Sequence, residues 1–211
     1  MSGKREQNRT QNRLSLIEAT LETIAEVGIA ETSVSAIVQR ADLSRGMIHL
    51  HFGGKDNLVD AAARHSSQEY YQRLETSLQN AGDSGQERIE VMVRADLDEE
   101  VLNRKYVTLW SAFRGEANNR PAFAEYADTR DARLSNLIQH AFGQIVDEAD
   151  LPEGQEVARD ATLGVLALME GMWADYLLHP DRFDRDEAAR VVFRFLAGLF
   201  PAHFSSQGAL S

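Results

Sequence analysis

The chain has 211 residues and a mass of 23.6 kDa, which suits one large domain or two small ones with a substantial core. It contains no cysteine, which excludes disulfides, thiolate metal sites and cysteine nucleophiles. The polar N-terminus has no apolar signal segment, and no uninterrupted apolar run reaches the roughly 18 residues of a membrane helix. We therefore expect a cytoplasmic, globular protein with no membrane partner.

Charge is distributed unevenly along the chain. The formal net charge of −11 by itself argues against a nucleic-acid partner, because an acidic field repels phosphates. Residues 1–64, however, carry eight basic and eight acidic side chains, so the excess of acid lies entirely beyond them. This pattern predicts two modules, a neutral head with a basic N-terminal arm and an acidic body. The acidic body alone is also explained by an ordinary solvated surface.

Helical signals run through nearly the whole chain. Apolar residues recur at spacings of three and four, and no run shows the sustained period of two that marks a strand. Serine, glycine and proline residues stand where helices are expected to start or stop. The expected helices cover residues 13–28, 34–41, 45–51, 55–78, 86–101, 104–117, 121–148, 154–178 and 185–199. The predicted fold class is all-α, with about nine helices.

Residues 33–55 carry the strongest functional signal. Two short helices joined by a tight turn form a helix-turn-helix, whose second helix enters the DNA major groove, although an ordinary helix pair has the same spacing. Arg45 can contact a guanine edge or a phosphate. Gly46 is a poor helix former, and its presence makes sense if the helix backbone must approach DNA closely. The candidate DNA-binding residues are Ser33 and Ser44, as N-caps with free amides, and Arg45, Gly46, Met47 and His49.

Two segments resemble the TetR family of one-component repressors. Residues 44–58 read SRGMIHLHFGGKDNL, which is similar to the family's recognition helix and the turn after it. Residues 19–34 read ATLETIAEVGIAETSV, which is similar to the family's first helix and the entry to its second. The resemblance is specific over roughly residues 10–65.

This resemblance implies how the head contacts DNA. Arg45, His49 and His51 would face the DNA, and Lys55 would open the fourth helix beside a phosphate. The family usually has tyrosine at the position of His49, so the operator sequence is left open. Residues 1–54 would form the DNA-binding domain.

The resemblance also implies that residues 55–211 form a ligand-binding and dimerisation domain. In this family the later helices enclose a small effector, and the last two helices pair with a second copy. A broad apolar face on the last helix is consistent with such pairing. A two-fold dimer would place two recognition helices about 34–36 Å apart on a pseudo-palindromic operator. The candidate dimerisation residues are Leu163, Leu166, Val192, Phe195 and Leu199.

Residues 109–113 (LWSAF), 130–134 (RDARL) and 169–173 (MEGMW) resemble the BetI-type branch, which represses choline-to-betaine genes and responds to choline. Aromatic rings with a carboxylate can form a cage for a quaternary ammonium, although aromatics at helical spacing also build cores. Arg114 facing the cavity would instead favour an anionic ligand, and an apolar ligand is a further alternative. The candidate ligand-binding residues are Tyr70, Trp110, Phe113, Arg114, Glu170 and Trp173.

Other classes of protein are less well supported by the residues. There is no glycine-rich phosphate motif and no Gly-x-Ser-x-Gly turn, so we expect neither an enzyme nor a cofactor. His49, His51 and His65 could be considered as a metal cluster, but His49 and His51 do not share a helical face, and no metal site is expected. A helical scaffold or ligand-binding protein without operator binding is the alternative. The sequence thus predicts a ligand-responsive, homodimeric repressor.

Overall fold

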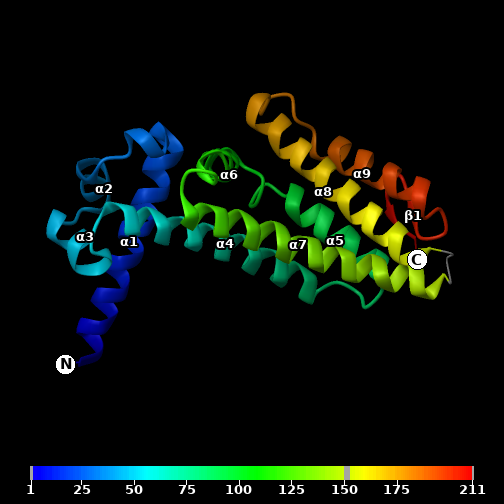
Figure 1. Ribbon diagram of the computed structural model, residues 1–211, viewed down its shortest axis with the longest axis horizontal. Coiled ribbons are helices and arrows are strands. Elements are labelled where there is room, and N and C mark those ends of the chain that lie inside the picture. The colour runs from blue at the N-terminus through cyan, green and yellow to red at the C-terminus, as the bar shows by residue number, and fades with distance from the viewer. Residues whose placement is uncertain (1, 150–152, 211) are drawn as a thin grey trace. The chain divides into compact units, whose positions relative to one another are not determined.

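The computed structural model describes residues 2–149 and 153–210, without the side chains at positions 2, 3, 121 and 124–132. Over this part of the chain it contains nine helices and one two-stranded hairpin (Figure 1), which confirms the all-α prediction. The helices are α1 (Ser2–Glu31), α2 (Val34–Ala41), α3 (Arg45–Phe52), α4 (Lys55–Gln79), α5 (Gly85–Leu97), α6 (Arg104–Glu116), α7 (Pro121–Glu148), α8 (Gly154–Leu178) and α9 (Arg185–Leu199).

The structure differs from the expected elements mainly at the two ends. Helix α1 begins eleven residues early because positions 2–12 contain good helix formers and no proline, although they lack an apolar stripe. Its helical geometry breaks at Gly28, where φ is +79°. The sequence predicted the end of the first helix at this glycine. At the other end, β1 (Phe204–Ser205) and β2 (Gly208–Ala209) form an antiparallel hairpin too short to give a periodic signal.

The chain divides into two compact units. The first comprises Met1–Glu69 and Thr108–Asp128, and the second comprises Tyr70–Val107 and Thr129–Ser211. The division therefore falls within α4, α6 and α7. The boundary predicted after residue 54 separates functional domains, and it stays a prediction.

In the first unit, α1 packs against α2 and α3 (Figure 1). Arg120 joins the segment between α6 and α7 to the start of α4, since its Nη2 lies 3.2 Å from Asp56 Oδ1 and 3.6 Å from Asp60 Oδ1. Burial of the apolar faces of these helices stabilises the unit. Its fully buried side chains include Leu16, Leu21, Ile24, Ile37, Leu58 and Phe113.

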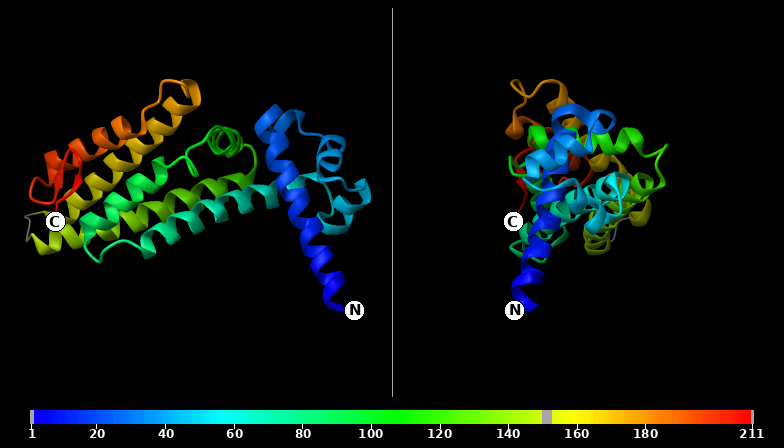
Figure 2. Two further views of the ribbon diagram at one scale, coloured as in Figure 1. Left: turned by 180° about the vertical axis from the view of Figure 1, so that it is seen from behind. Right: turned by 90° about the vertical axis from the view of Figure 1, so that its left-hand side faces the viewer.

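In the second unit, α8 and α9 run side by side, as the left view of Figure 2 shows, and α9 also packs on α5. A Cβ on Gly164 would lie 2.4 Å from the Phe195 ring, so the glycine permits this close approach of the two helices. Arg185 fixes the start of α9 by donating to the carbonyls of Leu97 and Leu102, the latter at 2.7 Å. These contacts place α5, α8 and α9 around one core.

One described helix, α8, is long and apolar enough to cross a membrane by length and composition. Polar residues are interspersed along α8, so it contains no uninterrupted apolar run of that length. A helix that packs against other helices passes the same test, and α8 packs against α9. Only 28% of this apolar stretch is buried within the chain, and its exposed residues include Leu163 and Leu178.

Candidate functional site

Helices α2 and α3 form a compact helix-turn-helix. Residues 42–44 make the turn, in which Asp42 is left-handed with φ 52° and ψ 44°. The amide of Leu43 donates to the Val38 carbonyl at 3.0 Å, which closes the turn. Ile37 and Ile48 are buried, so each helix contributes to the core of the head. This arrangement fixes α3 with one face packed and the other in solvent.

The solvent face of α3 carries Arg45, Gly46, His49 and Leu50. Leu50 is 67% exposed, and such a leucine on a short helix is available for apolar contact with a thymine methyl group. Arg45 donates from Nη2 to Ser35 Oγ at 2.6 Å. Met47, in contrast, is half-buried.

Among the described residues, none lies close enough to Gly46 to require a glycine there. A Cβ built at this position would meet only Ser44 Oγ, at 3.8 Å, which is ordinary contact. Glycine in a helix costs about 1 kcal/mol relative to alanine, and packing among the described residues does not explain that cost here. Close approach of another molecule to the backbone would explain it.

The two serines predicted as N-caps behave differently. Ser33 Oγ accepts the amide of Ala36 at 3.2 Å and therefore caps α2 as expected. Ser44 occupies the N-cap position of α3 in an extended conformation, but its hydroxyl makes no capping hydrogen bond. The predicted side-chain cap by Ser44 is therefore wrong, and its exposed hydroxyl accompanies the free amides of the helix start.

His51 and Lys55 are less exposed than the residues at the start of α3, and both are half-buried. Burial holds the pKa of His51 below its ordinary value of 6.5, and the nearby charges of Arg9 and Arg13 lower it further, so the ring is neutral at pH 7. The Arg13 guanidinium also lies 5.0 Å from the centre of the Phe52 ring. His51 thus lies beside α1.

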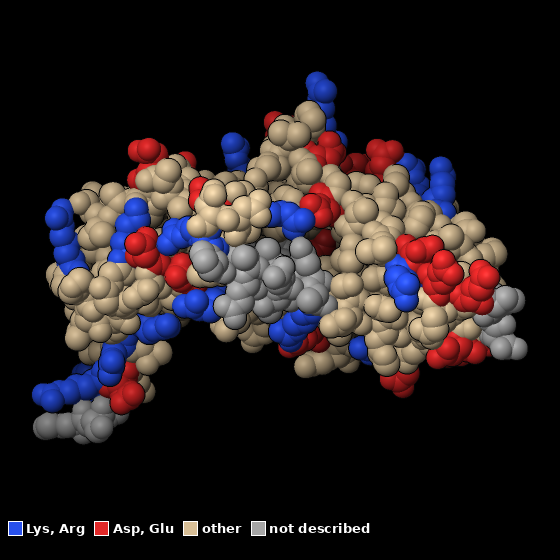
Figure 3. All heavy atoms as spheres, in the orientation of Figure 1, with Lys and Arg blue, Asp and Glu red and all other residues tan. Residues whose placement is uncertain are grey.

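The predicted basic arm is helical. Lys4, Arg5, Arg9 and Arg13 are exposed along the first part of α1. Figure 3 shows basic side chains at this end of the chain, at the lower left. Their positive charge is local, since the whole chain is acidic.

A buried carboxylate joins three helices of the second unit. Asp96 on α5 accepts a hydrogen bond from the Tyr70 hydroxyl on α4 at 2.7 Å and another from Trp173 Nε1 on α8 at 2.8 Å. The Tyr70 ring meets the Trp173 ring edge-on, with centroids 6.3 Å apart. The structure thus brings together two of the predicted aromatic residues, Tyr70 and Trp173, around a carboxylate that the sequence analysis did not select.

Asp96 also lines a hollow of about 260 Å³, a volume that includes solvent at its mouth. The remainder of the wall is apolar, and the side chains come from α5, α7 and α8. They are Ile89, Met92, Val93, Leu134, Ile138, Val165 and Met169. A carboxylate at an apolar wall favours a cation there, because charges interact more strongly away from water.

The sequence pattern around Asp96 indicates that its carboxylate is buried. Asp96 follows Ile89, Met92 and Val93 by seven, four and three residues, so it lies on the apolar stripe of α5. A carboxylate on such a stripe is buried unless the helix is unpacked. Glu170, the carboxylate that was predicted, is exposed on α8.

The other predicted ligand residues lie on α6, within the first unit. Phe113 is fully buried and meets Phe123 edge-on, with ring centroids 5.2 Å apart. Trp110 and Arg114 are half-buried, and the Arg114 guanidinium lies 5.5 Å from the Trp110 ring centre. Within the resembling segment 130–134, the side chains at 130–132 lie outside the described residues.

The last two helices present uncovered apolar residues. Leu163 is 59% exposed on α8, and Leu199 is 40% exposed on α9. Leu166 and Phe195 are half-buried. Val192 requires a correction, since it is fully buried in the chain's own core, where a partner cannot reach it.

Two models of known protein families match this chain, one near its N-terminus and one over its later helices. Residues 16–62 match the family described as bacterial regulatory proteins, tetR family, and residues 85–201 match the BetI-type transcriptional repressor, C-terminal. The HTH-type transcriptional regulator BetI of Stenotrophomonas maltophilia is 29% identical over 184 residues, 87% of this chain and 90% of that protein. The protein of the same name from Paraburkholderia phytofirmans is 31% identical over 181 residues, 85% of this chain and 88% of that protein.

Solved structures show the same fold. A transcriptional regulator from Pseudomonas aeruginosa PAO1 has a TM-score of 0.80 and 24% identity, covering 90% of each chain. A regulator from Saccharomonospora viridis, solved in complex with choline, has a TM-score of 0.75 and 18% identity, covering 89% of this chain and 96% of that one. The chain therefore belongs to the TetR family of helix-turn-helix transcriptional regulators and, within it, to the BetI-type repressors. It is a DNA-binding repressor by family and not an enzyme.

Proposed function

We propose that this protein is a homodimeric repressor that binds a pseudo-palindromic operator through α3 and leaves it when a quaternary ammonium compound, choline first, binds in the second unit. The observation that supports this choice of effector is the position of Asp96, which is buried between Tyr70 and Trp173 at the wall of an apolar hollow. Asp96 takes the role that the sequence analysis gave to Glu170.

The chemistry of this site fits a quaternary ammonium. Such a cation cannot donate a hydrogen bond from nitrogen, so it is held by a negative charge and by aromatic rings. Asp96 would supply the charge, while Tyr70 and Trp173 hold its carboxylate by hydrogen bonds and are not among the residues that line the hollow. The choline complex of a protein with this fold supports the choice of choline.

The exposed face of α3 supports operator binding by the head. Arg45 and His49 offer hydrogen bonds, Leu50 offers an apolar contact, and Gly46 leaves room for the DNA backbone. The exposed basic side chains of α1 would attract phosphates locally despite the acidic net charge.

The uncovered apolar residues of α8 and α9 support a dimer. Besides Leu163 and Leu199, Leu178 is 71% exposed and Val191 is 41% exposed. A Cβ on Gly171 would have nothing within 4 Å, so this point of α8 has space for a neighbouring helix. A two-fold pairing of these helices would bury the exposed leucines and present two heads to one operator.

The switch requires that the effector bind the DNA-free state more tightly, since equal affinity for both states shifts nothing. Helix α4 runs from Lys55 at the head to Gln79 and contains Tyr70, one of the two donors to Asp96. A ligand beside Tyr70 can therefore act on the helix that begins next to α3. An anionic ligand held by Arg114 is the alternative.

Replacing Arg45 and Lys55 separately distinguishes base reading from phosphate contact. We expect Arg45→Ala to weaken operator binding by about 1–3 kcal/mol and to relax specificity. We expect Lys55→Ala to weaken operator and random DNA alike and to lower the salt slope by about one. Fluorescence anisotropy over a range of salt concentrations measures both, with Arg104→Ala, an exposed arginine of the second unit, as the control. Equal losses on both DNAs for Arg45→Ala would contradict base reading.

The proposed function is tested with labelled DNA from the region upstream of the gene. We expect tight, salt-dependent binding that resists random competitor DNA and is reversed by choline, with saturable heat in a calorimetric titration of choline into the protein. Absence of DNA binding at low salt would contradict the regulator role, since even non-specific contacts form there. Choline binding without any change in operator affinity would contradict the proposed switch.

A further inference from the structure

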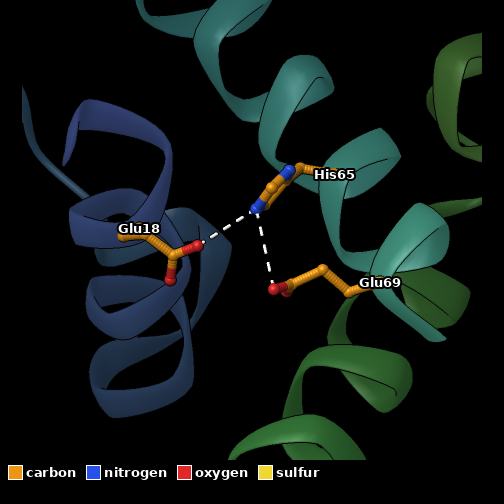
Figure 4. A group of neighbouring side chains, drawn as sticks. All are labelled: Glu18, His65 and Glu69. Carbon is orange, nitrogen blue, oxygen red and sulfur yellow. Dashed lines mark hydrogen bonds and ion pairs between the residues drawn. The ribbon is translucent and has the colours of Figure 1, made fainter. Parts of the chain in front are cut away.

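We propose that Glu18, His65 and Glu69 form a divalent metal site of the zinc type in the first unit (Figure 4). Glu18 comes from α1, and His65 and Glu69 come from α4, one helical turn apart. One ligand atom from each side chain lies within 4.8 Å of the other two. These three residues are neither among the predicted DNA-binding residues nor among those that line the hollow at Asp96.

The separations are close to those of a zinc site. Zinc bonds of about 2.0–2.2 Å in tetrahedral geometry place neighbouring ligand atoms roughly 3.4 Å apart. His65 Nε2 lies 3.1 Å from Glu18 Oε1 and 3.9 Å from Glu69 Oε1, which brackets this value. The ligand atoms of Glu18 and Glu69 lie within 4.8 Å of each other, so all three pairs are within reach of one bound ion.

A metal ion would hold together two carboxylates that face one ring nitrogen. Both carboxylates face the same ring nitrogen, as the dashed lines of Figure 4 show. That nitrogen carries at most one proton, which it can donate fully to only one of them. A cation at the same point attracts both carboxylates and accepts the lone pair of the neutral imidazole.

The ligand set specifies the class of metal. One neutral imidazole and two carboxylates balance the charge of a divalent ion, and imidazole is a ligand typical of zinc and neighbouring transition metals. The three side chains are half-buried, with exposed fractions of 24% for His65, 35% for Glu18 and 30% for Glu69. An ion can therefore enter, and a water molecule can fill the fourth position.

Such an ion would act on the head as a clamp. Helix α1 packs against α2 and α3, and α4 continues the chain directly after α3. Coordination by one ligand from α1 and two from α4 would close a loop that encloses the whole helix-turn-helix. Binding to the folded state alone raises the stability of this unit.

The test uses full-length, tag-free protein that has been treated with EDTA and dialysed, with zinc chloride as the probe. We expect calorimetry to show saturable binding of one zinc per chain in the micromolar range and a rise of several degrees in Tm at saturation. The main variant is Glu69→Gln, which keeps the hydrogen bond between Glu18 and His65 but removes a charged ligand. We expect it to weaken zinc binding about ten-fold or more and to abolish most of the Tm shift.

The chain provides a matched control on α8. Asp175 and His179 are also four residues apart, with Oδ1 and Nδ1 separated by 3.1 Å, and the described part of the chain brings no third ligand to them. His179→Gln is therefore expected to leave zinc affinity unchanged, whereas His65→Gln weakens it. The proposal is overturned if wild-type protein shows no saturable binding in this range, or if Glu69→Gln and His65→Gln bind zinc as tightly as wild type.

Discussion

Replacing Asp96 by asparagine is expected to lower the affinity for choline by about 2–5 kcal/mol, or roughly 30- to 5,000-fold. The carboxylate supplies the negative charge of the site at an apolar wall, where water cannot replace it. An amide of the same size keeps the volume of the side chain and removes only the charge. Calorimetric titration of choline into wild-type and variant protein measures the difference.

A neutral analogue separates charge from shape. In 3,3-dimethylbutan-1-ol, carbon replaces the ammonium nitrogen of choline, so the ligand keeps its form without its charge. We expect wild-type protein to bind this alcohol far more weakly than choline and Asp96→Asn to treat the two ligands almost alike. The double comparison isolates the interaction between the cation and Asp96.

The fold of the Asp96→Asn variant needs its own control. Asparagine can accept from only one of the two donors: its Oδ1 can keep the Trp173 bond while its Nδ2 donates to the Tyr70 hydroxyl, so we measure the stability of the variant beside its choline affinity. Tyr70→Phe removes one donor but keeps the charge, and we expect it to lose less choline affinity than Asp96→Asn. Equal choline binding by Asp96→Asn and wild type would contradict the proposed site, and preference for an anion would favour Arg114.

Replacing Leu163 by glutamate is expected to convert the protein to monomers and to weaken operator binding about 100-fold or more. Leu163 is 59% exposed, so the change costs the isolated chain little. A two-fold interface would bury one new charge from each copy, and each buried charge loses its hydration. The two like charges also repel each other. A dimer delivers its second head at high effective concentration, and this advantage of roughly 10²–10⁴ is lost in the monomer.

Analytical ultracentrifugation gives the oligomeric state, and anisotropy on the same samples gives the operator affinity. Leu210→Glu is the matched control, because Leu210 is an exposed leucine of the same unit that lies outside α8 and α9. We expect it to remain dimeric with unchanged operator affinity. A Leu163→Glu variant that sediments as a dimer would place the interface elsewhere.

Local signals in the sequence were enough to predict most helices. The apolar period and the breaking residues predicted α7, α8 and α9 with the bounds that the structure shows. These features depend on near neighbours in the chain, through helix capping and the exclusion of glycine and proline. The extension of α1 to Ser2 was missed because an exposed helix needs no apolar stripe. The hairpin after α9 was missed because two-residue strands show no period.

The candidate DNA-binding residues of α3 could be predicted from the sequence because they lie close together in the chain. Arg45, Gly46 and His49 lie on one short helix, so their common exposure follows from helical geometry alone. The distinct capping of Ser33 and Ser44 depends on side-chain rotamers, and sequence does not determine these.

The sequence by itself determined the all-α fold class, the helix-turn-helix and the family, because each depends on local patterns or on matching segments. Only the tertiary structure decided which carboxylate stands beside the aromatic rings. Asp96 meets Tyr70 across 26 residues and Trp173 across 77, so the cluster exists only after α4, α5 and α8 pack together. The approach of Glu18 to His65 across 47 residues has the same origin. Contacts between distant segments depend on how whole helix faces pack, which a local pattern does not contain.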